Sequence, residues 1–215
     1  MSKTSVYSLN CPRCGAENQV TVWESVNVTL DPDVKQMVLD GNIFEHQCPA
    51  CSFTGDIDHP CLYHDMDRNL LIYLMPHQTD GDGGDLAEND MPSFPAEIME
   101  AYVTRRVATV NRLREKVMIF DSGKDDRVME LYKWRVFENL FDTDPGFKFS
   151  EMYFISEEGE RFIIFDEDGD ARFLAFSPEV YLDIEKEFGP MFDTGSRPSF
   201  QTIDDAWAFS IINQR

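Results

Sequence analysis

The sequence has little of what a membrane or exported protein needs. Its longest apolar run, residues 70–75, is far shorter than the roughly 20 residues that cross a bilayer. No apolar segment follows the first methionine, so we expect no signal peptide. Only five of the 215 residues are cysteines, too few for a disulfide-rich secreted domain. These absences predict a cytoplasmic protein without a membrane association.

Basic side chains are also scarce. The chain has 19 lysines and arginines against 40 aspartates and glutamates, a net charge of −21. Nucleic-acid binding depends on local positive charge, and residues 1–78 hold only 4 basic side chains beside 10 acidic ones. The charge therefore disfavours direct nucleic-acid binding and favours a basic protein partner. A hydrophobic content of 42% and an aromatic content of 13% indicate a folded globule.

Two pairs of cysteines stand out against this background, in Cys-Pro-Arg-Cys at residues 11–14 and Cys-Pro-Ala-Cys at residues 48–51. The prolines fix φ near −65°, and Gly15 tolerates the left-handed conformation that closes a tight turn. Ser52 takes the glycine's place in the second pair, so we expect a less relaxed turn there. Four thiolates that meet at one point make a tetrahedral zinc site. We predict a structural Zn²⁺ ion held by Cys11, Cys14, Cys48 and Cys51.

Other interpretations of the cysteines are weaker. The 33 residues between the pairs exceed the usual 15–20, but the entropy of closing a loop grows only slowly with its length. Disulfides need an oxidising compartment. A redox Cys-x-x-Cys is usually single and lies near a βαβ pattern, which neither pair does. A redox role and a different metal remain as alternatives to zinc.

The motifs as a set resemble the CpXC-domain family, which takes its name from such cysteine turns. Besides the two pairs, the resemblance rests on residues 30–44, 62–65, 114–117 and 125–130, and it covers about residues 9–140. It implies a zinc ribbon with a helical insert. It implies no particular activity.

We expect an α+β protein in two parts. Residues 9–142 form a CpXC-type domain, with a zinc-ribbon-like β core at residues 9–76, an acidic loop at 77–97 and a helical part at 98–142. A Pro-Gly pair then marks a boundary, and residues 146–215 form a small antiparallel β/α module of no family that we recognise.

Periodicity and turn residues predict the elements. Alternating valines indicate a strand at residues 19–30, and Asp31 followed by proline begins a helix that Gly41 ends. A strand pair is expected at residues 61–64 and 70–75. Helices are expected at residues 97–120 and from Asp125 to about residue 140, and the second of them is apolar nearly all round, so we expect it to be largely buried. The later elements expected are strands at 148–156, 161–166 and 171–176 and helices at 178–188 and 203–213.

A second group of possible ligands comprises His59, Cys61, His64 and Asp65. It could hold another metal ion, but in a strand His59 and Cys61 would point to one face and His64 to the other. A structural role is favoured for all four, with Cys61 as a small buried hydrophobe. His64 oriented by Asp65 could otherwise act as a general base.

The sequence favours a structural-zinc protein that acts as a protein-interaction or adaptor module. A zinc ion with four thiolate ligands has no open position for a catalytic water, and the common phosphate-loop, Gly-x-Ser-x-Gly and His-Glu-x-x-His motifs are missing. We assign no catalytic residue. The alternatives are a hydrolase-like enzyme that uses His64 and Asp65, and an acidic inhibitor that mimics nucleic acid. The partner, the oligomeric state and the role of the last third stay open.

Overall fold

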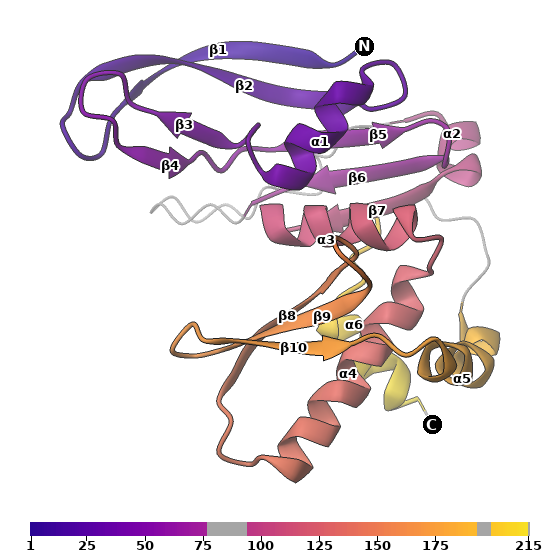
Figure 1. Cartoon of the computed structure of the whole chain (residues 1–215). Coiled ribbons are helices and arrows are strands. Elements are labelled where there is room, and N and C mark those ends of the chain that lie inside the picture. Colours follow the sequence, from indigo (N-terminus) through magenta and orange to yellow (C-terminus); the bar gives the residue numbers. More distant parts are fainter. Residues whose placement is uncertain (77–93, 193–198, 215) are drawn as a thin grey trace. The chain divides into compact units, whose positions relative to one another are not determined.

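The computed structural model describes residues 1–76, 94–192 and 199–214 (Figure 1). These residues divide into two compact units. The first holds residues 1–76, 94–114 and 199–201, and the second holds residues 115–192 and 202–214. The units are divided at a different place from the two domains that we expected from the sequence, and those domains stay a prediction. The expected acidic loop lies almost entirely outside the described residues.

The first unit is built on a five-stranded sheet in the order β1-β2-β5-β6-β7 (Figure 1). Its neighbours pair alternately: β1–β2 and β5–β6 are antiparallel, whereas β2–β5 and β6–β7 are parallel. On β2, Val20 and Val22 are buried and Thr21 between them is exposed, as the alternation predicts. The strands are β1 (Lys3–Asn10), β2 (Glu17–Asn27), β5 (Cys61–Asp65), β6 (Leu70–Leu74) and β7 (Val103–Val107).

The predicted helical insert is α1 (Pro32–Asp40), and it is followed by a small antiparallel pair, β3 (Glu45–Gln47) and β4 (Thr54–Asp56). Gly41 ends α1 with φ of 82°, the left-handed conformation expected there. Asp31 precedes the helix but does not cap it with its side chain, because its carboxylate accepts the Ser2 N–H at 2.9 Å instead.

The single helix expected at residues 97–120 is wrong. The segment contains α2 (Ala96–Ala101), strand β7 and α3 (Val110–Asp121). The valines and Thr104 of β7 suit a strand, and its register with β6, Leu70 opposite Val103, supplies hydrogen bonds that a helix would have made internally. Sheet pairing thus overrides a valine spacing that also fits a helix.

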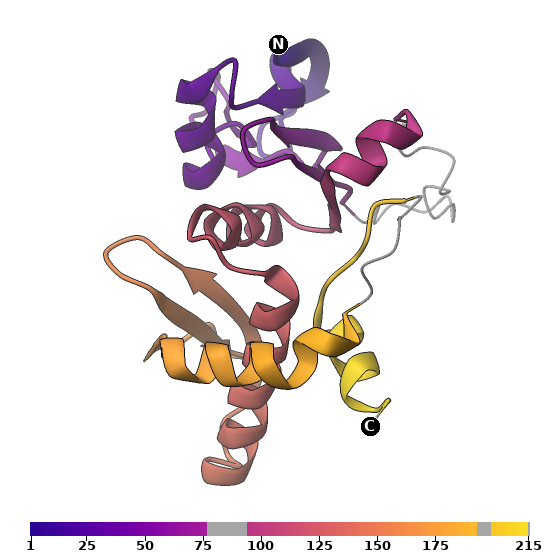
Figure 2. The same cartoon turned by 90° about the vertical axis from the view of Figure 1, so that its right-hand side faces the viewer.

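The second unit combines α4 (Asp126–Thr143), α5 (Pro178–Phe188) and α6 (Asp205–Ile212) with the sheet β10-β9-β8. Both α5 and α6 pack against α4 (Figure 2). Side chains cap two of these helices: Asp125 accepts the Arg127 N–H at 2.9 Å at the start of α4, and Ser177 accepts the Val180 N–H at 3.3 Å at the start of α5. The remaining elements are β8 (Phe149–Ile155), β9 (Arg161–Asp166), β10 (Ala171–Ala175) and a short 3-10 helix, η2 (Gly189–Met191).

This unit buries a chain of alternating charges that the sequence did not reveal. The Lys116 ammonium lies 3.0 Å from Asp126 and 3.1 Å from Glu130, and Lys133 lies 2.8 Å from Glu130 and 3.1 Å from Glu115. All five side chains are buried. Three of them lie on α4, so the expectation that this helix is apolar nearly all round is wrong. It is buried over its first half, but part of what it buries is charged.

Backbone groups complete the charge chain at both ends. Lys116 donates to the Ile203 carbonyl at 2.7 Å, and Glu115 accepts the Phe154 N–H at 2.8 Å. The buried charges and their backbone partners thereby join α3 and α4 to β8 and to the segment before α6. Buried charges are tolerated only when paired in this way.

The expected α+β class is confirmed: an N-terminal sheet carries a cluster of four cysteines, and helices and an antiparallel three-stranded sheet follow. No helix among the described residues is both long and apolar enough to cross a membrane.

Candidate metal centre

The two cysteine pairs lie in turns of the same construction. The first turn joins β1 to β2, and the second joins β3 to β4. The Cys11 carbonyl accepts the Gly15 N–H at 2.9 Å, and the Cys48 carbonyl accepts the Ser52 N–H at 2.8 Å. In both turns the N–H of the first cysteine also donates to the carbonyl five residues later. The repeated pattern aims each pair of thiols to one side of its turn.

The fourth residue after each first cysteine has a left-handed backbone. Gly15 has φ of 73° and Ser52 has φ of 56°. This conformation suits glycine but costs other residues roughly 1–2 kcal/mol. The second turn is therefore the less relaxed one, as the sequence predicts.

The four sulphur atoms lie within 4.8 Å of one another. The Sγ–Sγ distance is 3.7 Å from Cys11 to Cys51 and 3.8 Å from Cys14 to Cys48, so each sulphur has a close neighbour in the opposite turn. A tetrahedron with Zn–S bonds of about 2.3 Å has edges of about 3.8 Å. A disulfide would need about 2.05 Å, and all four cysteines are free thiols. The arrangement fits a metal ion with four sulphur ligands.

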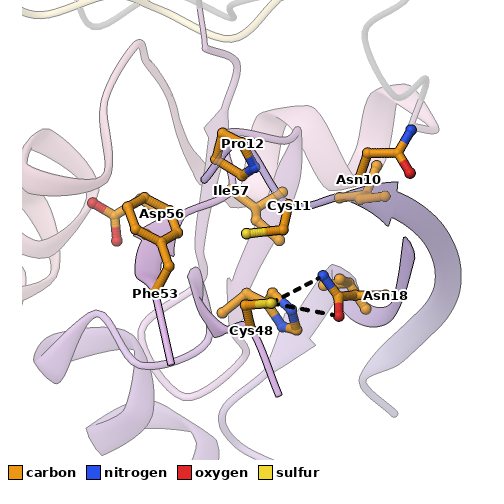
Figure 3. A pocket seen from close by; sticks show the side chains of 12 residues that line it. Asn10, Cys11, Pro12, Asn18, Cys48, Phe53, Asp56 and Ile57 are labelled. Carbon is orange, nitrogen blue, oxygen red and sulfur yellow. Dashed lines mark hydrogen bonds between the residues drawn. The ribbon is translucent and has the colours of Figure 1, made fainter. Parts of the chain in front are cut away.

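Asn18 supports one of these sulphurs from β2 (Figure 3). Its side-chain amide nitrogen lies 3.6 Å from Cys48 Sγ and donates to the Ala16 carbonyl at 3.1 Å. Both Asn18 and Cys48 are buried. The amide oxygen of Asn18 lies 3.8 Å from the same sulphur, so both ends of the amide contact Cys48 and fix the direction of this ligand. Sequence spacing gave no sign of this residue.

The thiols influence one another's ionisation. Burial opposes a Cys48 thiolate, but donation from the Ala50 and Cys51 N–H groups and from the neighbouring thiols outweighs it and lowers the pKa to about 6. The pKa of Cys51 is raised to about 12: the Phe53 N–H favours its thiolate, but burial and the three other sulphurs oppose a further negative charge. The first thiolate therefore forms easily and a later one does not. A cation at the centre would remove that conflict.

A small hollow of about 90 Å³, partly open to solvent, lies beside the centre and is lined in part by Cys11 and Cys48 (Figure 3). His46, two residues before Cys48, also lines it. The Nε2 atom of His46 is buried and has no hydrogen-bond partner among the residues that the structure describes. His46 thus borders the centre without taking part in the sulphur cluster.

Each candidate of the second group has its own contacts. His59 Nδ1 lies 2.8 Å from the Ile57 carbonyl and Nε2 lies 3.1 Å from the Trp23 carbonyl. Cys61 is fully buried on β5, and this burial raises the pKa of its thiol to about 12. Its surroundings are those of a small buried hydrophobe.

His64 and Asp65 lie on opposite faces of β5. His64 Nδ1 is 3.3 Å from the Asn27 amide and Nε2 is 3.3 Å from the Tyr102 hydroxyl, whereas the Asp65 carboxylate pairs with Arg68 at 3.1 Å. Partial burial lowers the pKa of His64, although the Asp65 charge opposes the shift. Within the described part of the chain, Cys11, Cys14, Cys48 and Cys51 make the one group of metal-type ligands that is close enough to hold an ion.

Fold and centre together define a mixed α/β protein whose N-terminal sheet carries four cysteines close enough to hold a metal ion. The chain belongs to the CpXC family: the family model, described as CpXC protein, matches residues 9–133, more than half of its length. The resemblance seen in the sequence is thereby confirmed. Neither the curated proteins nor the solved structures compared with the chain gave a match.

Proposed function

We propose that Cys11, Cys14, Cys48 and Cys51 hold a structural zinc ion and that the chain is a cytoplasmic protein-interaction module. The observation that carries the proposal is the pair of 3.7 and 3.8 Å sulphur distances between turns far apart in sequence. Such an ion would join the β1–β2 turn to the β3–β4 pair, which is only three residues long in each strand. So short a pair gains little stability from its own hydrogen bonds.

The ligand set favours zinc in a structural role. Four soft thiolates in tetrahedral geometry suit zinc, and they leave no open position for a catalytic water. The same set can hold iron, so the metal's identity has to be measured. The free thiols of the cluster also suit a reducing compartment such as the cytoplasm.

Binding, rather than catalysis, is the better account of the rest of the first unit. His64 and Asp65 face opposite sides of β5, so the carboxylate cannot orient the imidazole as a catalytic pair requires. The net charge of −21 supports a basic protein as partner, because attraction between unlike charges speeds and orients association.

The test is the metal content of the purified protein, measured by mass spectrometry beside the variants Cys11→Ser and Cys48→Ser. Cys61→Ala serves as the matched control, because Cys61 is a buried cysteine outside the cluster. We expect one zinc per chain in the unsubstituted protein and in Cys61→Ala, and loss of zinc in the other two. Zinc that stays bound in Cys11→Ser and Cys48→Ser would contradict the proposal, as would a protein purified without any metal.

A further inference from the structure

A row of aromatic rings runs along α4 to α6 in the second unit. Ring centroids are 5.8 Å apart from Trp134 to Phe137, 6.5 Å from Phe137 to Phe141 and 5.4 Å from Trp134 to Phe209. The three residues of α4 are spaced three and four apart, so they share one side of the helix. We call these four residues the aromatic stripe.

The stripe is only partly covered. Phe141 is 67% exposed and Phe209 is 53% exposed, far more than packing residues of this size usually are. Trp134 Nε1 is buried with no hydrogen-bond partner in the described residues. The two exposed rings lie at the ends of the stripe, and the half-buried Trp134 and Phe137 lie between them. A partly exposed row of aromatic side chains is typical of a binding surface.

Negative charge lies next to the stripe. Glu138 and Asp142 are exposed and lie one helical turn apart on α4. Neither forms an ion pair within the described residues. The last turn of α4 has no basic residue, so its free carbonyl groups add to the negative potential there. An occupant of the stripe would therefore have to be apolar and positively charged at once.

The same unit already shows how such an occupant is held. The Arg172 guanidinium lies 4.1 Å from the ring centre of Phe147 and pairs with Asp144 at 3.0 Å, immediately after the end of α4. Arg127 likewise lies 4.6 Å from the ring of Phe192. Arginine suits this position because its flat cation stacks on a ring while its N–H groups reach a carboxylate.

We propose that the aromatic stripe and the adjoining carboxylates of Glu138 and Asp142 bind an arginine-bearing segment of a basic protein partner. The surface begins at residue 134, where the match to the CpXC family ends at residue 133, so it is not part of what the family model describes. The inference rests on the proposed interaction role and names the chemistry of the partner and the surface that receives it.

The test uses a fluorescent amphipathic peptide with arginine on one face and leucine on the other, and the same peptide with neutral citrulline in place of arginine. Anisotropy at physiological salt would measure binding to the full chain. Phe141→Ser removes the most exposed ring of the stripe, and Leu182→Ser is the matched control, because Leu182 is 58% exposed on α5. We expect about tenfold weaker binding for Phe141→Ser, about 1.4 kcal/mol, and an unchanged affinity for Leu182→Ser.

The outcomes separate this inference from the zinc proposal. Equal binding by Phe141→Ser and Leu182→Ser, equal binding of the citrulline peptide, or no saturable binding would overturn the stripe as a docking surface. Sedimentation of the free protein gives a further check: a dimer that Phe141→Ser converts to a monomer would show that a second copy, not a basic partner, covers the stripe. Metal content measured on the same samples tests the zinc centre independently.

Discussion

Gly15 and Ser52 occupy the same place in the two cysteine turns, with φ of 73° and 56° and matching hydrogen bonds to the carbonyls of Cys11 and Cys48. The two turns that form the centre thus have the same backbone conformation. Only the second copy has a side chain at the left-handed position, which glycine accepts without strain. The strain should be measurable.

Ser52→Gly should stabilise the protein. Relief of the left-handed strain, roughly 1–2 kcal/mol, exceeds the extra chain entropy of glycine in the unfolded state, so we expect a gain of about 0.5–1 kcal/mol in the free energy of unfolding. Ser52→Ala keeps the strain and is the control. Urea denaturation checks both variants. An equal effect of alanine and glycine would show that the backbone at residue 52 is not strained.

Lys116→Met should destabilise the protein strongly. The change leaves the buried carboxylates of Asp126 and Glu130 without the ammonium that lies 3.0 and 3.1 Å away. Loss of one partner from a buried ion pair costs about 3–5 kcal/mol. Lys148→Met is the matched control, because the Lys148–Glu167 pair is exposed and such pairs contribute about 0–1 kcal/mol. Similar losses for both variants in urea denaturation would refute the role given to the charge chain.

The buried ion pairs of Lys116 should make the protein less stable at alkaline pH. Burial disfavours the Lys116 ammonium, but Asp126, Glu130 and Glu115 outweigh burial and raise its pKa above the ordinary 10.5. The folded state therefore keeps a proton that the unfolded state loses. The stabilisation is complete below pH 10.5 and disappears as the pH rises through the folded-state pKa. The difference in unfolding free energy between the unsubstituted protein and Lys116→Met should shrink above pH 10.5; a constant difference would contradict this.

Mild acid should act through His64. Partial burial lowers its pKa below the ordinary 6.5, against the smaller influence of Asp65. Between 6.5 and the folded-state pKa, the unfolded state binds a proton that the folded state does not, so stability falls as the pH drops through this window. His64→Gln removes the titration and should flatten the dependence between pH 7.5 and pH 5. An unchanged slope would assign the acid sensitivity to other groups.

The sequence predicted what depends on local chemistry. The cysteine pairs, Gly41 at the end of α1 and the start of α4 at Asp125 follow from spacing and turn residues, and the structure confirms their placement. Strand β7 could not be found in this way, because its pairing with β6 is non-local. Asn18 was missed for a similar reason: no motif marks a residue that approaches Cys48 across 30 positions of sequence.

The burial of the charged residues on α3 and α4 could not be predicted from the composition. Lys116 and Lys133 look like ordinary surface residues of a helix until α3 and α4 are brought together. The aromatic residues expected in the helix from Asp125 to about residue 140 were interpreted as largely buried, and this holds for Tyr132, whereas Trp134 and Phe137 are only half-buried. Periodicity shows which residues share a face, but not how far the rest of the fold extends over that face.

X-ray absorption at the zinc edge tests the central claim most directly. The account predicts one shell of four sulphur atoms at about 2.3 Å and no nitrogen or oxygen ligand, because Cys11, Cys14, Cys48 and Cys51 alone lie within reach of a shared ion among the described residues. A shell with fewer sulphurs and a nitrogen or oxygen neighbour would contradict it. Such a result would move the metal away from the four-cysteine centre or open a position for chemistry.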